Sequence, residues 1–369
     1  MSATSNQTRA GINYAVWNGT NWTTQKISPT GSTNNKIAID PNNKPHIVYQ
    51  AYDGLKHIFW NGTNWITQTV YVPPGMGWVY FSVAIDSSGN PHIVYATINL
   101  PIDELRYTVW TGSNWNTTTI DSGSFPYWAP SITLDSHDIP HITYFDQTNM
   151  DLTEKGTLKY ATPKGSNWSI QTVDTPFYSQ SSLALDSKGY PHISYTNASN
   201  DGLEYTSWDG TAWIKQTVDA DWDFHGDCYL GLDSDDKPQI AYFVAVGEEC
   251  DLKYAVWTGE NWSIQLVDSN TASGAMVLDS SGNPHIAYNR PVIWASGNAS
   301  RTYDLTYATL SGGRPNSSHS SNPSASPTIP ELSEQVLGTT LFVFGLTATF
   351  VVVSKKKMAN KSPVKKSRS

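Results

Sequence analysis

Val277–Tyr288 has the sequence VLDSSGNPHIAY, in which two short apolar runs flank a polar turn that contains glycine. This pattern predicts two antiparallel strands joined by a tight turn. The same motif occurs in Ile37–Tyr49, Val83–Tyr95, Ile132–Tyr144, Leu183–Tyr195 and Leu230–Tyr242. The turn aspartates Asp40, Asp86, Asp135, Asp186, Asp233 and Asp279 are separated by 46, 49, 51, 47 and 46 residues. A period of this length, made of short strands, favours a propeller over a helical repeat.

Each repeat contains a second pair of predicted strands, in which two tryptophans flank a short turn. Leu252–Val267 (LKYAVWTGENWSIQLV) is the clearest copy, with Trp257 before the turn and Trp262 after it. The equivalent pairs are Trp17/Trp22, Trp60/Trp65, Trp110/Trp115 and Trp208/Trp213, whereas Pro163 precedes Trp168 in the fourth repeat. Four antiparallel strands per repeat make one propeller blade, and we expect the tryptophans to pack between blades.

The order of the strand pairs predicts how the ring closes. Gly11–Ile27 is a tryptophan-type pair with no aspartate-type pair before it, and Ala275–Tyr288 is the last aspartate-type pair. Joining these two ends completes a sixth blade, so we predict an all-β, six-bladed propeller of four-stranded antiparallel blades over residues 11–310. Leu305–Leu310 (LTYATL) is one strand too many. It either displaces Ile12–Trp17 from the sixth blade or belongs to a seventh, and the sequence leaves both possibilities open.

Charge is distributed unevenly between the repeats and the C-terminus. The chain has a formal net charge of −9, but residues 355–369 contain seven lysine and arginine residues and no acid. Removing those seven positive charges from −9 leaves −16 for the rest of the chain. Nucleic-acid binding requires a basic face, so the acidic body argues against it.

The recurring histidines and aspartates are the first candidates for chemistry. A histidine follows the turn in most repeats, at His46, His92, His141, His192 and His285, and Gln239 takes its place in the remaining one. Metal ligands must converge to about 2 Å from one ion, whereas each of these histidines belongs to a different blade. One carboxylate per turn is also too few for calcium. We therefore interpret both residue types as structural and expect no metal or cofactor.

The loops that interrupt the repeat are rich in aromatic residues. In a propeller, the loops between blades and between the second and third strands gather at one end of the ring. We predict a ligand-binding rim there, formed by Trp78, Tyr80, Tyr127, Trp128, Tyr178, Trp222, Phe224, His225 and Trp294. The same loops add the acids Asp53, Asp146, Glu248 and Glu249. Aromatic faces with a few polar groups suit a sugar or a peptide; the alternative is that the aromatic residues only plug the ring.

Cysteines and glycosylation sequons indicate whether the protein lies inside or outside the cell. Cys228 and Cys250 flank one strand pair, where they either form a single disulfide or remain thiols. The sequon N-x-S/T predicts N-glycosylation at Asn18, Asn21, Asn61, Asn116, Asn167, Asn197, Asn261, Asn298 and Asn316. These sites agree with a propeller that is exposed outside the cell.

Both ends of the chain differ from the repeats. Residues 1–10 are polar and lack the apolar run of a secretory signal. Residues 311–335 are rich in serine and proline, which predicts an extended stalk. Residues 336–353 are 18 residues without a charge, followed by lysines. This pattern predicts a single C-terminal transmembrane helix, with residues 354–369 as a basic cytoplasmic tail and the propeller outside.

The aspartate turn resembles the Asp-box of sialidase-like propellers. Here the spacing is D-x-x-G, as in Asp279 and Gly282, and proline and histidine follow where the Asp-box has tryptophan. The resemblance implies a propeller fold and, in sialidases, a clamp of three arginines on the substrate carboxylate. The propeller contains only Arg106, Arg290 and Arg301, of which the last two share one loop. A clamp draws on separate blades, so the arginines argue against sialidase activity.

The C-terminus resembles the surface-anchoring tails of exported archaeal proteins. Its parts are the serine- and proline-rich stalk, the Pro330–Glu331 pair, the apolar span and the basic end. The resemblance implies a protein held at the cell surface. It extends over about the last 60 residues, from the stalk onward.

Three functions are compatible with these features. We favour a membrane-anchored cell-surface propeller that acts as a non-catalytic binding or adhesion module for glycans or proteins. The first alternative is a glycan-processing hydrolase or lyase, which needs two carboxylates about 5–10 Å apart. Asp221 or Asp223 with Glu248 or Glu249 are the candidates. The second alternative is a structural component of the cell envelope.

Overall fold

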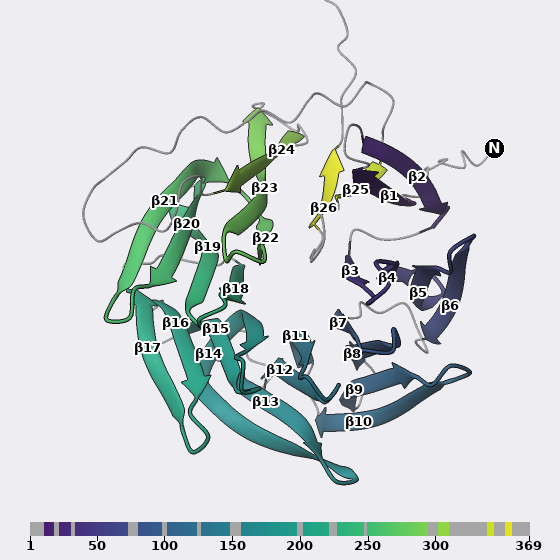
Figure 1. Cartoon of the computed structure of the whole chain (residues 1–369), viewed down its shortest axis with the longest axis horizontal. Coiled ribbons are helices and arrows are strands. Elements are labelled where there is room, and N and C mark those ends of the chain that lie inside the picture. Colours follow the sequence, from purple (N-terminus) through teal and green to yellow (C-terminus); the bar gives the residue numbers. More distant parts are fainter. Residues whose placement is uncertain are drawn as a thin grey trace, which may run out of the picture.

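The chain forms an all-β ring of antiparallel blades, as seen in a computed structural model (Figure 1). The structure describes residues 11–17, 22–30, 34–72, 80–97, 102–123, 127–147, 156–197, 202–220, 227–246, 249–293, 302–309, 338–342 and 351–355. The predicted six-bladed propeller is confirmed: six blades, each with one aspartate turn, follow one another around the ring. Within a blade, the first strand lies nearest the ring axis and the last strand lies at the outside.

Three of the blades have the four separate strands that the repeat predicts. Blade 1 consists of β3 (Asn35–Ile39), β4 (Pro45–Ala51), β5 (Gly54–Trp60) and β6 (Trp65–Tyr71). Blade 2 consists of β7 (Tyr80–Ile85), β8 (Pro91–Thr97), β9 (Asp103–Trp110) and β10 (Trp115–Gly123). Blade 5 consists of β18 (Cys228–Leu232), β19 (Pro238–Val246), β20 (Glu249–Trp257) and β21 (Trp262–Thr271). Each of these blades is an antiparallel sheet in sequence order.

Blades 3 and 4 share one long strand and together form a seven-stranded sheet. Blade 3 contains β11 (Tyr127–Leu134), β12 (Pro140–Asp146) and β13 (Gly156–Lys164). The strand β14 (Asn167–Leu185) is the last of blade 3 and then the first of blade 4. Blade 4 continues with β15 (Pro191–Asn197), β16 (Gly202–Trp208) and β17 (Trp213–Asp219).

The structure decides between the two ways of closing the ring. Blade 6 contains β22 (Gly274–Leu278), β23 (Pro284–Ile293) and β24 (Thr302–Thr309), so the extra strand takes the third position. The strands β1 (Ile12–Trp17) and β2 (Trp22–Ser28) therefore do not complete blade 6, and that assignment is wrong. They form a separate sheet beside blade 1, where the buried Ile12 packs with Ile37 and Ile47 (Figure 1).

The other half of this separate sheet comes from the C-terminus. The strands β25 (Gly338–Phe342) and β26 (Val351–Lys355) pair antiparallel, and β25 adjoins β1. The predicted transmembrane helix over 336–353 is therefore not confirmed: its described residues are strands, a conformation that β-branched valines favour. No helix long and apolar enough to cross a membrane occurs among the described residues. The stalk at 311–335 lies outside those residues.

The aspartate turn is stabilised by its own side chains, as the structural interpretation predicts. In blade 2, Asp86 Oδ1 accepts hydrogen bonds from the backbone N–H groups of Ser88 and Asn90, at 2.9 and 2.7 Å. His92 Nε2 lies 3.4 Å from Asp86 Oδ2, and its Nδ1 lies 2.6 Å from the hydroxyl of Tyr107. His92, His141 and His192 therefore link their own turns to the third strands of their blades. In blade 5, Gln239 accepts from the Tyr254 hydroxyl, and its Nε2 donates to the Gly282 carbonyl in the turn of blade 6 at 3.0 Å.

Neighbouring blades are joined by two repeated contacts. At the outside, the indole N–H of Trp213 donates to Gln171 Oε1 of the preceding blade at 3.2 Å, and its ring packs on Tyr160. Nearer the axis, Asp219 at the end of blade 4 accepts from the Tyr242 hydroxyl and from Lys253 of blade 5, at 2.8 and 2.9 Å. The equivalent aspartates Asp121, Asp174 and Asp268 accept from Tyr144, Tyr195 and Tyr288. The second tryptophan of a pair thus packs between blades, as predicted, whereas the first, such as Trp208, packs on its partner within the hairpin.

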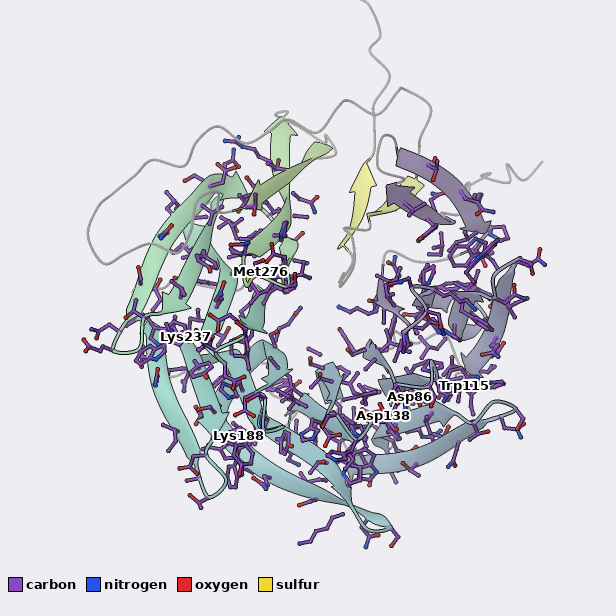
Figure 2. The ribbon with its side chains drawn as sticks, viewed as in Figure 1. Asp86, Trp115, Asp138, Lys188, Lys237 and Met276 are labelled. Carbon is purple, nitrogen blue, oxygen red and sulfur yellow. The ribbon has the colours of Figure 1, made fainter. Side chains whose placement is uncertain are left out.

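Two pairs of blades are also joined at their aspartate turns. Ser87 in blade 2 donates its backbone N–H to Asp138 Oδ1 in blade 3 at 2.8 Å, and its hydroxyl to Oδ2. Figure 2 shows the turn residues Asp86 and Asp138 on these adjacent blades. Ser187 and Asp236 repeat the contact between blades 4 and 5. An aspartate at this turn position, where φ is positive, therefore reaches the blade before it.

The possible disulfide between Cys228 and Cys250 is not formed. Cys228 lies on β18 opposite Tyr242, and Cys250 lies on β20 opposite Ala245, so the whole width of β19 separates them. Two strand spacings of about 4.8 Å already exceed the roughly 7 Å Cα separation that a disulfide tolerates. Cys228 is instead buried at the interface with blade 4, where the Ser194 hydroxyl donates to its Sγ at 3.3 Å.

Candidate functional site

At one equivalent position on the first strands, the residue type differs from blade to blade. The residue four places before each turn aspartate is Lys36, Ser82, Ser131, Ser182, Tyr229 or Ala275 in blades 1 to 6. It pairs with the residue before the repeated tyrosine of the second strand, as in Lys36 with Val48 and Tyr229 with Ala241. Its sequence neighbours, such as Ile37 and Cys228, are buried on one face of the strand, so alternation places this position on the other face. On that face the Ser182 hydroxyl accepts a hydrogen bond from Leu230 N–H of blade 5 at 3.0 Å, and Tyr229 packs against the core between blades 5 and 6. We call these six residues the inner ring.

Lys36 and Tyr229 interrupt the small side chains of the inner ring, and Asp227 accompanies them. The Tyr229 hydroxyl donates to Asp227 Oδ2 at 3.1 Å. Lys36 and Asp227 interact electrostatically although β3 and β18 lie on opposite sides of the ring axis (Figure 1). Lys36 is exposed, whereas Asp227 and Tyr229 are half-buried. We call these three residues the Lys36 cluster.

Desolvation perturbs every ionisable group of the Lys36 cluster. It lowers the pKa of Lys36, an effect that the negative charge of Asp227 opposes. It raises the pKa of Asp227, against the hydrogen bond from Tyr229 and the charge of Lys36. Burial and the nearby Asp227 hold the pKa of Tyr229 well above its usual value, so its phenol stays protonated at neutral pH. Of these groups, the half-buried Asp227 carboxyl with its raised pKa is the kind that occurs more often at functional sites than elsewhere.

The Lys36 cluster lies at the loop end of the ring, which is the end where the first strands begin. Lys36 is the second residue of β3, Tyr229 is the second residue of β18, and Asp227 directly precedes β18. A backbone hydrogen bond of 3.3 Å from Phe243 N–H to the Asp227 carbonyl holds this entry to the strand. The aspartate turns lie at the opposite end of the same strands. The cluster therefore occupies the end at which sequence analysis places a binding rim.

Backbone irregularity marks the same end of blade 3. The register of β11 with β12 shifts between Trp128 and Ser131, and Ala129 has a φ of 44°. Left-handed backbone is unfavourable for a residue with a Cβ. Such bulges redirect strands at the edges of sheets and beside functional sites. In blade 2, the half-buried Tyr80 occupies the position that corresponds to Asp227, six residues before the turn aspartate.

The described residues test only part of the predicted aromatic rim. Trp78, Trp222, Phe224, His225 and Trp294 lie outside them, as do the side chains of Trp128 and Tyr178. Tyr80 lies at the predicted end of the ring. Tyr127 does not face a ligand: it is 2% exposed and packs on Tyr144, with ring centroids 5.8 Å apart. Its burial between blades 2 and 3 contradicts its assignment to the rim.

Two acids of the predicted rim, Asp53 and Asp146, form ion pairs with lysines. Asp53 is exposed and pairs with Lys56 at 2.8 Å. Asp146 pairs with Lys159, which also contacts Asp121 at 2.9 Å. Asp221, Asp223 and Glu248 lie outside the described residues, as does the side chain of Glu249. The pair of carboxylates that a glycosidase requires therefore stays a prediction.

Two arginines that a sialidase-type clamp would need are engaged elsewhere. Arg106 bonds to Glu104 in its own strand and lies over the ring of Tyr71, 5.9 Å from its centroid. Arg290 lies 3.4 Å from Asp268 at the interface of blades 5 and 6. Arg301 is outside the described residues. Within the described ranges, no group of three or more His, Cys, Asp or Glu side chains is arranged to hold a metal ion.

The predicted glycosylation sites differ in how available their amide nitrogens are. Asn61, Asn116, Asn167 and Asn261 are exposed, in or beside the turns between the third and fourth strands. Asn197 is half-buried, and its Nδ2 donates to Asp174 Oδ2 at 3.1 Å. Since N-glycosylation requires that nitrogen, Asn197 is a poor acceptor in the folded protein. Asn18, Asn21, Asn298 and Asn316 lie outside the described residues.

Sequence analysis does not predict Lys36, Asp227 or Tyr229 as site residues, although the sequence contains a signal for two of them. Aligning the six repeats on their turn aspartates puts a serine in blades 2, 3 and 4 at the inner-ring position. A lysine in blade 1 and a tyrosine in blade 5 depart from that pattern. Asp227 has no such signal because the residue six places before the aspartate varies among the repeats.

Comparison with known proteins supports the fold. No protein-family model and no curated protein matches the sequence. A solved structure of a protein of unknown function from Dyadobacter fermentans DSM 18053 has a TM-score of 0.51 at 10% identity, covering 74% of this chain and 93% of that chain. An ulvan lyase from a new family of polysaccharide lyases has a TM-score of 0.49 at 14% identity, covering 72% and 77%. The six-bladed fucose lectin of Aleuria aurantia has a TM-score of 0.45 at 12% identity, covering 84% and 98%. At such identities, structural similarity establishes a propeller fold alone.

Proposed function

We propose that the protein is a non-catalytic, carbohydrate-binding propeller whose ligand contacts the Lys36 cluster at the loop end of the ring. One observation supports this most directly. The inner ring departs from small side chains at Lys36 and Tyr229. There the Tyr229 phenol donates to the Asp227 carboxylate, and the Lys36 ammonium interacts electrostatically with that carboxylate across the ring. Convergent donors and acceptors beside aromatic surface are what sugar hydroxyls require. The repeated aspartates, tyrosines and histidines instead bond to one another within and between blades.

A glycan array with purified protein tests the site. We expect Lys36→Ala and Asp227→Asn to weaken the binding of any positive glycan by about tenfold or more, as for a central contact residue. Lys188→Ala is the matched control, since Lys188 is an exposed lysine in the aspartate turn of blade 4, at the opposite end of the strands (Figure 2). Equal binding by wild type and all three variants would contradict the proposal for this site.

The aromatic rim is part of the same proposal and can be tested on the same array. Trp128→Ala and Trp222→Ala remove two indoles from the loops predicted to surround the Lys36 cluster. If the rim contributes to sugar binding, each variant loses signal for the glycans that depend on Lys36. Unchanged signal for both would restrict the ligand contacts to the inner ring.

We also propose that the propeller is held outside the cell, on the stalk at 311–335, by a single membrane span at 336–353 and the basic tail at 354–369. The support is the uncharged length of the span and the lysines that follow it. A bilayer requires that backbone polar groups bond within the spanning segment. The proposal therefore requires β25 and β26 to leave their sheet and become helical in a membrane.

Membrane extraction separates the two states of this segment. Full-length protein in membranes isolated from expressing cells should resist extraction by alkaline carbonate. A chain that ends at residue 310 should be found in the soluble fraction. Recovery of the full-length chain in the soluble fraction would contradict the anchor. Binding to the glycan array does not depend on this outcome, so the two parts of the proposal are tested separately.

Catalysis is a second candidate function, and the perturbed pKa values of Lys36 and Asp227 favour testing it. Desolvation raises the pKa of Asp227 and lowers that of Lys36, so the two pKa values lie closer together than they do in water, as is common for groups that transfer protons. Any glycan that binds should therefore be incubated with the protein and assayed for new reducing ends. Release that Asp227→Asn abolishes would favour the enzyme over the binding module.

A further inference from the structure

We infer that the Lys36 cluster selects an uncharged, hydroxyl-rich sugar over a sugar that carries a carboxylate or sulfate group. This inference rests on the proposed function and adds the chemical class of the ligand. It is drawn from the charges of the inner ring and from the hydrogen-bonding capacity that its side chains leave unused.

Within the Lys36 cluster one positive charge is balanced by one negative charge. Lys36 is the one charged residue of the inner ring, whose other members are Ser82, Ser131, Ser182, Tyr229 and Ala275, and Asp227 adds a carboxylate beside Tyr229. A site for an acidic sugar normally presents excess positive charge, often as arginine. In the Lys36 cluster the one cation is accompanied by a carboxylate that would repel an anionic ligand. The balance of charge therefore favours a neutral ligand.

The hydrogen-bonding groups of the cluster are complementary to hydroxyls. A carboxylate only accepts hydrogen bonds and an ammonium only donates them. Tyr229 supplies one hydrogen bond to Asp227 Oδ2, and a carboxylate has room for several more. A sugar hydroxyl can donate to Asp227 while accepting from Lys36, and two adjacent hydroxyls can do so together. A ligand carboxylate could accept from Lys36 but has no hydrogen to offer Asp227.

The surroundings add to this discrimination because they leave Asp227 poorly solvated. Burial raises the pKa of the half-buried Asp227 carboxyl, so its charged form is less favourably solvated than in water. A hydroxyl donor from the ligand therefore improves the environment of this carboxylate. A second negative charge brought beside it would be less screened than at an exposed surface. The phenol of Tyr229, which stays protonated, adds no charge of its own.

The test compares sugars that differ at one carbon. Wild-type protein is titrated with oligosaccharides of glucose and of glucuronate, and with those of galactose and of galacturonate, so that a hydroxymethyl group is replaced by a carboxylate. We expect the neutral member of a binding pair to bind at least about tenfold more tightly, which corresponds to about 1.4 kcal/mol. Raising the salt concentration should reduce this preference, because salt screens the charge repulsion that causes it.

Two charge variants reverse the balance in opposite directions. Asp227→Asn gives the cluster a net positive charge, so we expect the preference for neutral sugar to fall by about tenfold or more. Lys36→Gln removes the cation and should weaken neutral binding while leaving acidic sugars excluded. Lys188→Ala should change neither. Because Lys36 is exposed, its variant is expected to fold even if Asp227→Asn is unstable, and thermal melting checks both.

The outcomes distinguish this inference from the proposed function. Tight binding of acidic sugars by the wild type, dependent on Lys36, would overturn the inference while supporting a glycan site. An unchanged preference in Asp227→Asn would also overturn it. Absence of binding to every neutral and acidic glycan would overturn the proposed function itself, and the inference with it.

Discussion

Nδ1 of His57 lies 3.2 Å from Oε1 of Gln68, and this contact occupies the oxygen that would otherwise accept a hydrogen bond from an indole of the next blade. At the corresponding interfaces, Gln25, Gln171 and Gln216 accept hydrogen bonds from the indoles of Trp65, Trp213 and Trp262. The indole that corresponds to them here, Trp115 Nε1, is buried and has no hydrogen-bond partner among the described residues (Figure 2). The other blades with a described third-strand side chain have tyrosine at the position of His57. A tyrosine bonds the second-strand histidine and leaves the glutamine unoccupied.

We therefore predict that His57→Tyr stabilises the protein. The new hydroxyl should bond to His46, as Tyr107 bonds to His92, and should release Gln68 to accept from Trp115. Satisfying a buried donor contributes about 1 kcal/mol to the free energy of unfolding. Thermal melting should show a rise in Tm. The reciprocal control, Tyr107→His, should lower it, and a fall in Tm for His57→Tyr would contradict the prediction.

The His46–His57 pair should also make the protein sensitive to acid. Nδ1 of His46 lies 3.0 Å from Nε2 of His57, and the two rings stack with centroids 5.1 Å apart. Burial lowers the pKa of His46 to about 4, against the nearby Asp40 and with the help of Lys44. Burial, together with the charge of His46, lowers the pKa of His57 to about 3. Both imidazoles are therefore neutral in the folded protein at neutral pH.

The sign of the pH effect follows from these directions. The unfolded chain, with histidine pKa values of about 6.5, binds protons more readily than the folded protein does. Stability from this pair is complete above about pH 6.5 and falls as the pH drops toward 4, by up to about 1.4 kcal/mol per pH unit for each histidine. Urea unfolding between pH 7.5 and pH 4 measures the slope. The double variant His46→Gln/His57→Tyr, which copies Gln239 and Tyr254 of blade 5, should flatten it; an equal slope would argue against the pair.

Asp174 should be among the most important residues at a blade interface. Its carboxylate accepts from the Tyr195 hydroxyl at 2.7 Å and from Asn197 Nδ2 at 3.1 Å, and it pairs with Lys215. Asp174→Ala leaves buried donors without an acceptor, so we predict a loss of about 2–4 kcal/mol in the free energy of unfolding. The control is Asp209→Ala, in an exposed turn where the carboxylate bonds only to its own loop. Equal losses in urea unfolding would show that the interface contact adds little.

The repeat made the blades predictable, because each depends on local chemistry that is written out six times. Aspartate turns, alternation and paired tryptophans are short-range signals, and all of them reappear in the structure. Ring closure was harder to predict because two similar strands, β24 and β1, could each pair with β23 in blade 6. β24 follows β23 after a short loop, whereas β1 would have to come from the other end of the chain. The shorter connection, which costs less chain entropy, is the one that forms.

The aromatic loops predict a site at the end of the ring where we propose that the Lys36 cluster binds a ligand. Tyr127, however, is buried between blades, where its side chain fills the core. The relevant contrast lies instead on the first strands, at Lys36 and Tyr229. Whether Lys36 and Asp227, 191 positions apart, interact across the ring depends on ring geometry, which no local pattern specifies. Comparing each repeat position across all blades is the way to find such residues.

The cysteines provide a prediction that is independent of any ligand. Cys228 is buried, and desolvation raises the pKa of its thiol to about 12, so the nucleophilic thiolate is scarce at neutral pH. A maleimide should therefore modify Cys228 in the native protein far more slowly than in urea, with mass spectrometry identifying the site. Cys228→Ser keeps the size of the side chain but puts a more polar group into the core, and should lower Tm slightly. Electrophoretic mobility should be the same with and without reductant, because β19 separates the two cysteines; a reductant-dependent shift in the monomer would show that the strand order at this blade is different.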